Sequence, residues 1–174
     1  KLNENEVFWV ARDITERKLA EESLKRRNTY LAASSDIARL VTSTLDLNTL
    51  FNRTVNLVRE RFGFYHASIF IVEETGFTAH LQEATGEAGA AMKAQRHSLQ
   101  VGSQSIVGQV PQSGVPIIVN DTGTSTMHKF NPLLPDTRAE AAIPLRVGNR
   151  VIGALDIQST QTEAFSEDDV AVLQ

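Results

Sequence analysis

The sequence of 174 residues contains no cysteine. This excludes disulfides, thiolate nucleophiles, cysteine-ligated metals and chromophores attached through a thioether. It also contains no apolar run near the ~18 residues that a membrane-spanning helix needs, so we expect no membrane contact within it. Lys and Arg form no basic stripe, and the net charge is -4. These features argue against a nucleic-acid-binding surface.

A metal site is not expected either. The four histidines include no pair at the i,i+4 spacing of helical metal ligands, and no acidic companion motif accompanies them. A haem iron needs only one histidine, and His128 is the candidate for it. A lone surface histidine is the commoner situation, so we predict no metal.

The start of the sequence runs from a strand-like stretch straight into a charged helix opening. Residues 7–14 are apolar on both faces, and no Gly or Pro lies between 15 and 43. About 29 residues can therefore form one helix of roughly 43 Å. The Asp-Ile-Thr of residues 13–15, followed by Glu-Arg-Lys, resembles the C-terminal end of a PAS domain. We expect residues 1–14 to be the last strand of such a domain and 15–43 to be a linker or signalling helix.

Apolar residues repeat every seven positions along this helix, with further ones in the alternating slot of the same heptad. One interpretation is an amphipathic helix that packs on its own domain. The other is a parallel two-helix seam across a dimer, which a second apolar stripe favours because each stripe then has its own partner. The residues expected at the seam are Ala20, Leu24, Leu31, Ala38 and Val41.

Residues 44–174 carry the patterns of an α+β domain with a largely antiparallel sheet. Gly86–Met92 is rich in small residues, and we expect it to be mobile. Helical periodicity predicts helices at 47–62, at 103–112 with Pro111 as its stop, and from Ser166, where the helix is expected to continue past the last residue. Alternation predicts strands at 67–72, 77–84, 97–101 and 115–119, and a hairpin over 139–158 with its turn at 148–149 and Pro144 at a bulge or an edge-facing position.

Several short segments in this order resemble a GAF domain. They are Gly-Gln-Val at 108–110 leading into 113–121, Ile-Pro-Leu at 143–145, Val-Ile-Gly-Ala-Leu at 151–155, and Phe165 before Asp168-Asp169. The resemblance implies a six-stranded sheet, helices on one face that often dimerise, and a small-molecule cavity on the other. It places the domain at 44–174.

A PAS end followed by a GAF domain on continuous helices resembles the sensory half of a bacterial signalling protein. The resemblance implies a cytoplasmic homodimer, most often a sensor histidine kinase, that binds a small ligand and relays the signal through its helices. No output motif lies within the sequence, so we expect these residues to be non-catalytic. Alternatives are a ligand-silent dimerisation spacer, or the regulatory module of a cyclic-di-nucleotide enzyme or a transcription regulator.

The long segment from Asn120 to Arg138 has little periodicity, which is typical of lids and binding loops. We expect it to roof a ligand pocket with Phe70 as the floor and His97 and Glu140 at the sides. The alternative is a solvated loop without a ligand. The candidate pocket residues are Phe70, His97, Asp121, Met127, His128, Phe130, Arg138 and Glu140.

The motifs of known GAF subtypes narrow the choice of ligand. Bilin photoreceptors of the usual kind attach their chromophore to a cysteine, and the free methionine sulfoxide reductases use cysteine redox chemistry, so the resemblance implies neither here. Members that bind cyclic nucleotides show an Asn-Lys pair and a later Phe-x-x-x-Asp-Glu. Phe165 and Asp169 fit, but Val170 replaces the Glu and no Asn-Lys occurs. A cyclic nucleotide is therefore disfavoured, and the cofactor is left unknown.

Overall fold

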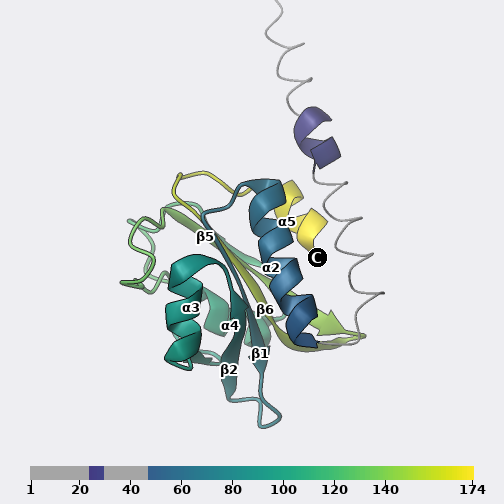
Figure 1. The fold of residues 1–174 in the computed structure, drawn as a ribbon, viewed down its shortest axis with the longest axis vertical. Coiled ribbons are helices and arrows are strands. Elements are labelled where there is room, and N and C mark those ends of the chain that lie inside the picture. Colours follow the sequence, from purple (N-terminus) through teal and green to yellow (C-terminus); the bar gives the residue numbers. More distant parts are fainter. Residues whose placement is uncertain (1–23, 30–46) are drawn as a thin grey trace, which may run out of the picture.

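A computed structural model describes residues 24–29 and 47–174 of the chain. Residues 47–174 form a six-stranded sheet flanked by helices (Figure 1). The strand expected at 1–14 and most of the expected linker helix lie outside the described residues, although 24–29 are helical. Of the expected seam residues only Leu24 is described, and it is 60% exposed. Within the described residues, no helix is long and apolar enough to cross a bilayer.

The strands are β1 (His66–Val72), β2 (Thr78–Ala84), β3 (Ser98–Gln100), β4 (Ile117–Val119), β5 (Ala139–Val147) and β6 (Arg150–Ser159). They lie in the order β3-β2-β1-β6-β5-β4, and every neighbouring pair is antiparallel. The largely antiparallel α+β fold predicted from the alternating patterns is therefore confirmed. The second strand of the long hairpin, β6, pairs with β1, so an early and a late strand of the domain meet in the middle of the sheet.

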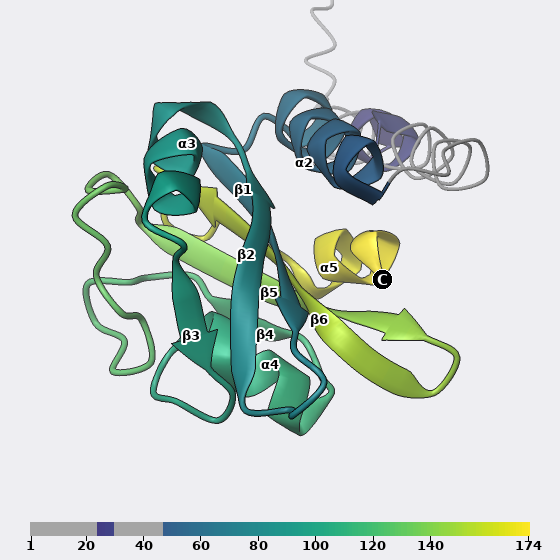
Figure 2. The same cartoon turned by 60° about the horizontal axis from the view of Figure 1, so that its bottom comes forward.

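Apolar side chains cover both faces of this sheet. Helices α2 (Leu47–Phe62) and α5 (Glu167–Leu173) pack on one face, where every second residue of the central strands contributes to a buried core. Helix α4 (Ile106–Ser113) packs on the opposite face with a second core around Phe70. Figure 2 shows α2 and α5 together on one side of the sheet, with α4 on the other.

The β5–β6 hairpin forms as its pattern predicted. Residues 148–149 make the two-residue connection, and Gly148 has the positive φ of 58° that a type II′ turn requires. Pro144 pairs with β6 but lies beyond residues 140–142, the part of β5 that pairs with β4. It therefore takes the edge-facing position, where its missing N–H breaks no ladder. The bulge lies at residues 145–146.

Pro111 does not end the helix predicted over 103–112, so that expectation was wrong. α4 continues through Pro111 to Ser113. A proline inside a helix lacks the N–H that would bond to the preceding turn, and its ring crowds that turn, so it weakens or kinks a helix without always ending it. The helix ends instead at Gly114, which adopts the left-handed conformation with a φ of 70°.

The expectation that Gly86–Met92 is mobile was also wrong. It forms most of helix α3 (Gly86–Ala94), which packs beside β2. Alanine supports helix strongly, and Met92 anchors the helix by packing with Ala84 and Leu134 in a third buried cluster. Small residues in this segment therefore serve close packing rather than mobility.

Candidate functional site

A cavity of about 340 Å³ lies on the α4 face of the sheet, under the loop between β4 and β5. Its floor comes from the central strands, one side from the end of α3 and from β3, and its roof from the loop. The lining residues are Ser68, Phe70, Met92, Gln95, His97, Leu99, Ser105, Val107, His128, Lys129, Phe130, Asn131, Pro132, Leu133, Leu134, Glu140, Asp156 and Gln158.

The floor is a network of polar side chains on neighbouring strands. Oδ2 of Asp156 accepts hydrogen bonds from Ser68 Oγ at 3.1 Å and from Gln158 Nε2 at 2.9 Å. Thr137 Oγ1 in turn donates to Gln158 Oε1 at 2.6 Å. Asp156 is only 2% exposed. Its other oxygen, Oδ1, is buried and has no hydrogen-bond partner among the residues that the structure describes.

Burial raises the pKa of Asp156 well above its usual range, and the negative charge of nearby Glu140 raises it further. Hydrogen bonds from Gln158 and Ser68 favour the carboxylate but do not outweigh these effects. The carboxyl group is therefore neutral over a wider range of pH than an exposed aspartate. A cation placed next to it would reverse this balance by stabilising the carboxylate.

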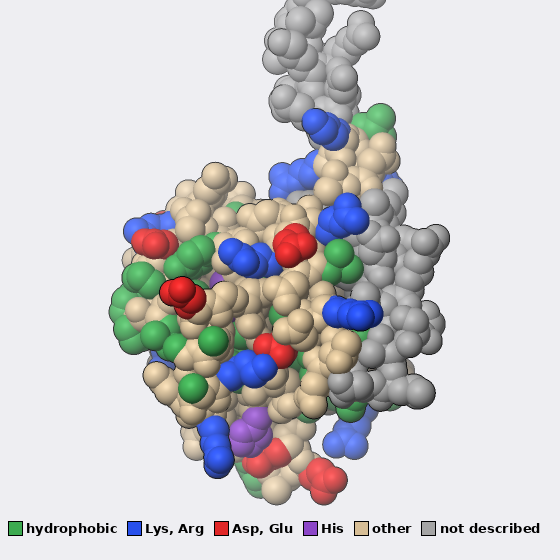
Figure 3. Space-filling model, viewed as in Figure 1, with side chains coloured by type: hydrophobic (Ala, Val, Ile, Leu, Met, Phe, Trp, Pro, Cys, Tyr) green, Lys and Arg blue, Asp and Glu red, His purple; other side chains and the backbone are tan. Residues whose placement is uncertain are grey.

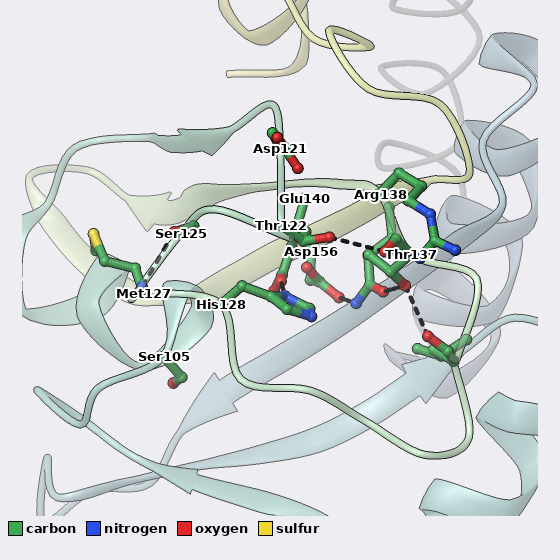
Figure 4. Close-up of polar contacts among 12 residues, drawn as sticks. Ser105, Asp121, Thr122, Ser125, Met127, His128, Thr137, Arg138, Glu140 and Asp156 are labelled. Atoms are coloured by element: carbon green, nitrogen blue, oxygen red, sulfur yellow. Dashed lines mark hydrogen bonds and ion pairs between the residues drawn. The ribbon is translucent and has the colours of Figure 1, made fainter.

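His128 ties the roof of the cavity to its floor. Its Nδ1 lies 2.6 Å from Oε2 of Glu140, and both side chains are largely buried. Figure 4 shows the imidazole of His128 pointing from the loop toward Glu140, with Asp156 beside them. The loop is thereby held across the two acidic side chains.

Unlike the polar floor, the side of the cavity is mainly apolar, and its mouth has an exposed lysine. Phe70 and His97 form an edge-to-face ring pair with centroids 6.0 Å apart, and Leu99 and Val107 continue the apolar wall. Partial burial, assisted by the positive charge of Lys129, lowers the pKa of His97. Lys129 itself is exposed at the mouth.

The loop from Asn120 to Arg138 is anchored at both ends. At its start, Asn120 Nδ2 donates to the carbonyl of Phe165 at 2.7 Å, and Oδ1 accepts from the N–H of Phe165 at 3.0 Å. At its end, the N–H of Thr122 bonds to the carbonyl of Arg138 at 2.8 Å. The loop is thus fixed to the segment that enters α5 as well as to the cavity.

The structure brings several of the candidate residues together and leaves others apart. Phe70, His97, His128, Phe130 and Glu140 line the one cavity. Their role in binding a ligand stays a prediction.

The other three candidates are absent from the cavity wall. Asp121 accepts the N–H of Gly123 at 2.9 Å within a local turn. Met127 packs into the core beside α4, and Arg138 is exposed, with its guanidinium near the carbonyl of Thr137. A loop without periodicity gives no indication of which side chains turn inward, so the sequence could not place these three side chains. Their role in binding stays a prediction.

The acidic floor contains residues that the sequence analysis missed, namely Ser68, Asp156 and Gln158. Ser68 and Asp156 each interrupt an apolar run, and Gln158 follows two residues after Asp156 on the same face of the strand. A polar residue inside such a strand is a signal in itself, because an isolated buried carboxylate is costly. That signal was present in Leu155-Asp156-Ile157.

No three His, Asp or Glu side chains within 24–29 and 47–174 are placed to hold a metal ion. His128, Glu140 and Asp156 nevertheless concentrate acidic and imidazole groups at one end of the cavity. Over the face seen in Figure 3, charged side chains of both signs are interspersed, so the concentration of acid in the cavity is a local feature.

A family model for the GAF domain matches residues 44–174. The chain belongs to the GAF domain family. GAF domains are a sensory and regulatory fold, and the cavity of this GAF domain lies on the sheet face opposite α2 and α5. No protein of curated function matches the chain.

Solved GAF structures share the fold at low identity. The GAF domain of a phosphoenolpyruvate-protein phosphotransferase from Coxiella burnetii is 21% identical, with a TM-score of 0.73 over 83% of this chain and 86% of that one. Free methionine-R-sulfoxide reductase from Neisseria meningitidis, solved in complex with its substrate, is 20% identical, with a TM-score of 0.68 over 96% of this chain and 87% of that one. The A. aeolicus nlh2 GAF domain in an inactive state is 18% identical, with a TM-score of 0.68 over 85% and 86%.

Proposed function

We propose that this GAF domain is a sensor that binds a small molecule through a positively charged amine, with Asp156 and Glu140 as the counter-charges. The observation that carries the proposal concerns Asp156, a residue of the cavity wall, whose buried Oδ1 has no hydrogen-bond partner among the described residues. Ser68 and Gln158 both donate to Oδ2. A hydrogen-bond donor from a ligand would supply the partner that Oδ1 lacks.

An ammonium group fits this position better than a neutral donor. Two acidic side chains approach each other here, and the negative charge of Glu140 raises the pKa of Asp156. An opposite charge within a few ångströms favours the ionised carboxylate. A cation would therefore gain from both acids, in a partly enclosed site where water screens the attraction weakly.

The same pocket supports binding rather than reduction. The solved reductase from Neisseria meningitidis was obtained with its substrate and shares the fold. The present chain contains no cysteine, and the family resemblance implies that the reductases depend on cysteine redox chemistry. We assign these residues a regulatory, non-catalytic role.

Isothermal titration calorimetry with linear alkylamines from butylamine to hexylamine tests the proposal. We expect saturable binding near neutral pH that weakens at least tenfold in Asp156→Asn, which keeps the shape but loses the charge. Glu83→Gln is the matched control, because Glu83 is a buried acid paired with Lys93 at 2.7 Å outside the cavity. Absence of binding to any of the amines, or equal binding by Asp156→Asn, would contradict the proposal.

We further propose that binding biases the helices that leave the domain. The roof loop is joined through Asn120 to Phe165, which precedes the capping box of Ser166 and Asp169 at the start of α5. Asp169 Oδ2 also accepts a hydrogen bond from Arg26 Nη2 at 2.6 Å. These contacts support a route from the cavity to both the N-terminal and the C-terminal helices.

The parent protein that suits such a route is a cytoplasmic bacterial signalling protein with a PAS domain before this one, most often a histidine kinase acting as a homodimer. Hydrogen exchange of α5 with and without the bound amine tests the relay. Faster or slower exchange of α5 on binding is expected, and Asn120→Ala should remove that difference while amine affinity persists. Unchanged exchange of α5 would favour the ligand-silent spacer, or a module of another output enzyme or regulator.

A further inference from the structure

The wall of the cavity carries charges of both signs, buried acids and an exposed lysine. Glu140 and Asp156 lie at the floor, and Lys129 lies exposed at the mouth. No carboxylate of the described residues forms an ion pair with Lys129. Lys93, on the neighbouring α3, is by contrast paired with Glu83 at 2.7 Å.

A second group at the mouth can act with Lys129. The side chain of His97 lines the cavity and lies close enough to Lys129 for the ammonium charge to oppose its protonation. An uncharged imidazole still donates one N–H. An anionic group held between them would meet a positive charge and a hydrogen-bond donor together.

The two ends are separated by an apolar stretch. Asp156 lies opposite Ser68 on β1, whereas His97 packs against Phe70, two residues further along the same face of that strand. That offset alone corresponds to about 7 Å along the strand. Between the ends the wall is formed by apolar side chains, among them Phe70, Leu99 and Val107. Alkyl groups of a ligand would be buried favourably against them.

We propose, resting on the amine site described above, that the ligand is an ω-amino acid: its ammonium binds at Asp156 and Glu140, its alkyl chain crosses the apolar wall, and its carboxylate binds at Lys129 and His97. An α-amino acid has its two charges on adjacent carbons and cannot place one at each end. A plain amine occupies the floor only and leaves Lys129 without a counter-charge. Lys129 is thus the residue that determines specificity, and the acidic floor supplies the attraction common to all amines.

Three sets of probes separate these contributions by calorimetry. The ω-amino acids 4-aminobutanoate, 5-aminopentanoate and 6-aminohexanoate are compared with butylamine, pentylamine and hexylamine, which lack the carboxylate. They are also compared with their isomers 2-aminobutanoate, norvaline and norleucine, which have the same atoms but adjacent charges. We expect at least one ω-amino acid to bind tenfold or more tightly than both its matched amine and its isomer.

Substitution of the mouth lysine provides the decisive comparison. In Lys129→Gln the advantage of the ω-amino acid over its matched amine should fall below threefold, because the carboxylate of the ligand loses its counter-charge. Lys25→Gln removes the same charge from an exposed helical site away from the cavity and should leave the advantage intact.

Each failure has a separate meaning. If the amines bind but no ω-amino acid binds more tightly, the ω-amino acid assignment is wrong and the amine site stands. An advantage that persists in Lys129→Gln, or an α-isomer that binds as tightly, also overturns the assignment. If none of the probes binds, the proposed amine site fails and the present inference fails with it.

Discussion

The buried carboxyl group of Asp156 lowers the stability of the fold as it ionises, and the same group is the proposed counter-charge for the ligand. Its pKa is raised in the folded protein by burial and by Glu140, so the unfolded chain ionises first as pH increases. Each unit of that difference destabilises the fold by about 1.4 kcal/mol once the pH exceeds both pKa values. The stability that the neutral form provides is therefore complete at pH below about 4 and declines as pH rises toward the pKa of the folded protein.

Asp156→Asn removes this loss of stability, because an amide does not ionise. We expect the variant to match the wild type in melting temperature near pH 3.5 and to exceed it by a margin that grows as pH rises to 8. Differential scanning fluorimetry across this range measures the margin. Asp136→Asn, at an exposed loop position, is the control and should show no such trend. A margin that shrinks with increasing pH would contradict the assignment of a neutral Asp156.

His66 has the opposite dependence on pH. Its ring is buried beside Thr85, and burial, with a smaller contribution from Arg59, lowers its pKa from 6.5 to about 4. The unfolded chain therefore takes up a proton first as pH falls. The stability associated with neutral His66 is complete above pH 6.5 and is lost between there and about 4, a loss of about 3 kcal/mol.

Urea unfolding between pH 4 and 7.5 tests this for His66→Gln. We expect the variant to lose less free energy of unfolding than the wild type over that interval, because it has no imidazole to protonate. His80→Gln, at an exposed histidine near Glu73, should follow the wild-type curve. Parallel curves for the His66 variant and the wild type would show that His66 is already accessible to protons in the folded protein.

At the scale of elements, the pairing of β1 with β6 holds the acidic floor together. Gly153 pairs with Ile71, and a Cβ added to it would lie 2.0 Å from the carbonyl oxygen of Phe70. Backbone atoms in the middle of a sheet cannot move away as a flexible side chain can. The close approach of these two strands therefore depends on glycine at this position.

Gly153→Ala should lower the free energy of unfolding by about 3 kcal/mol, measured by urea denaturation with the midpoint and slope both fitted. Gly123→Ala is the matched control, since its added Cβ would meet only the Asp121 side chain at 3.2 Å on an exposed turn. If both variants unfold at the wild-type midpoint, the strands have more room than this packing implies.

At the scale of the whole molecule, the helical segment 24–29 lies outside the sheet and contacts α5. Leu24 is 60% exposed on the helical segment 24–29, and Arg26 of the same segment bonds to Asp169 in α5. One side of this segment thus contacts the domain, while an apolar side chain faces solvent. A second copy of the chain is the partner that the heptad pattern indicates.

Leu24→Glu should therefore weaken the proposed dimer of the chain, because it would place a charge in the proposed apolar seam. Light scattering after size-exclusion chromatography, at several protein concentrations, measures the mass. Lys25→Glu, at the neighbouring outward position of the heptad, is the control and should remain dimeric. A wild-type chain that is monomeric at high concentration would exclude the dimeric seam.

The sequence by itself determined the elements, because their signals are local. The alternation over residues 139–158, the turn at 148–149 and the cap at Ser166 each depend on neighbours in the chain, and the structure confirms them. Local patterns failed where packing prevails over composition, as in α3, whose small residues form a helix against β2.

Only the tertiary structure decided which polar side chains meet. Ser68, Asp156 and Glu140 come from three strands whose order in the sheet is not written in any one segment. Alternation shows that two residues share a face, but here both faces are covered, so it could not show which face holds the cavity. The orientations of two loop side chains also depend on the tertiary structure. His128 turns inward, where it contacts Glu140 of β5, whereas Arg138 is exposed.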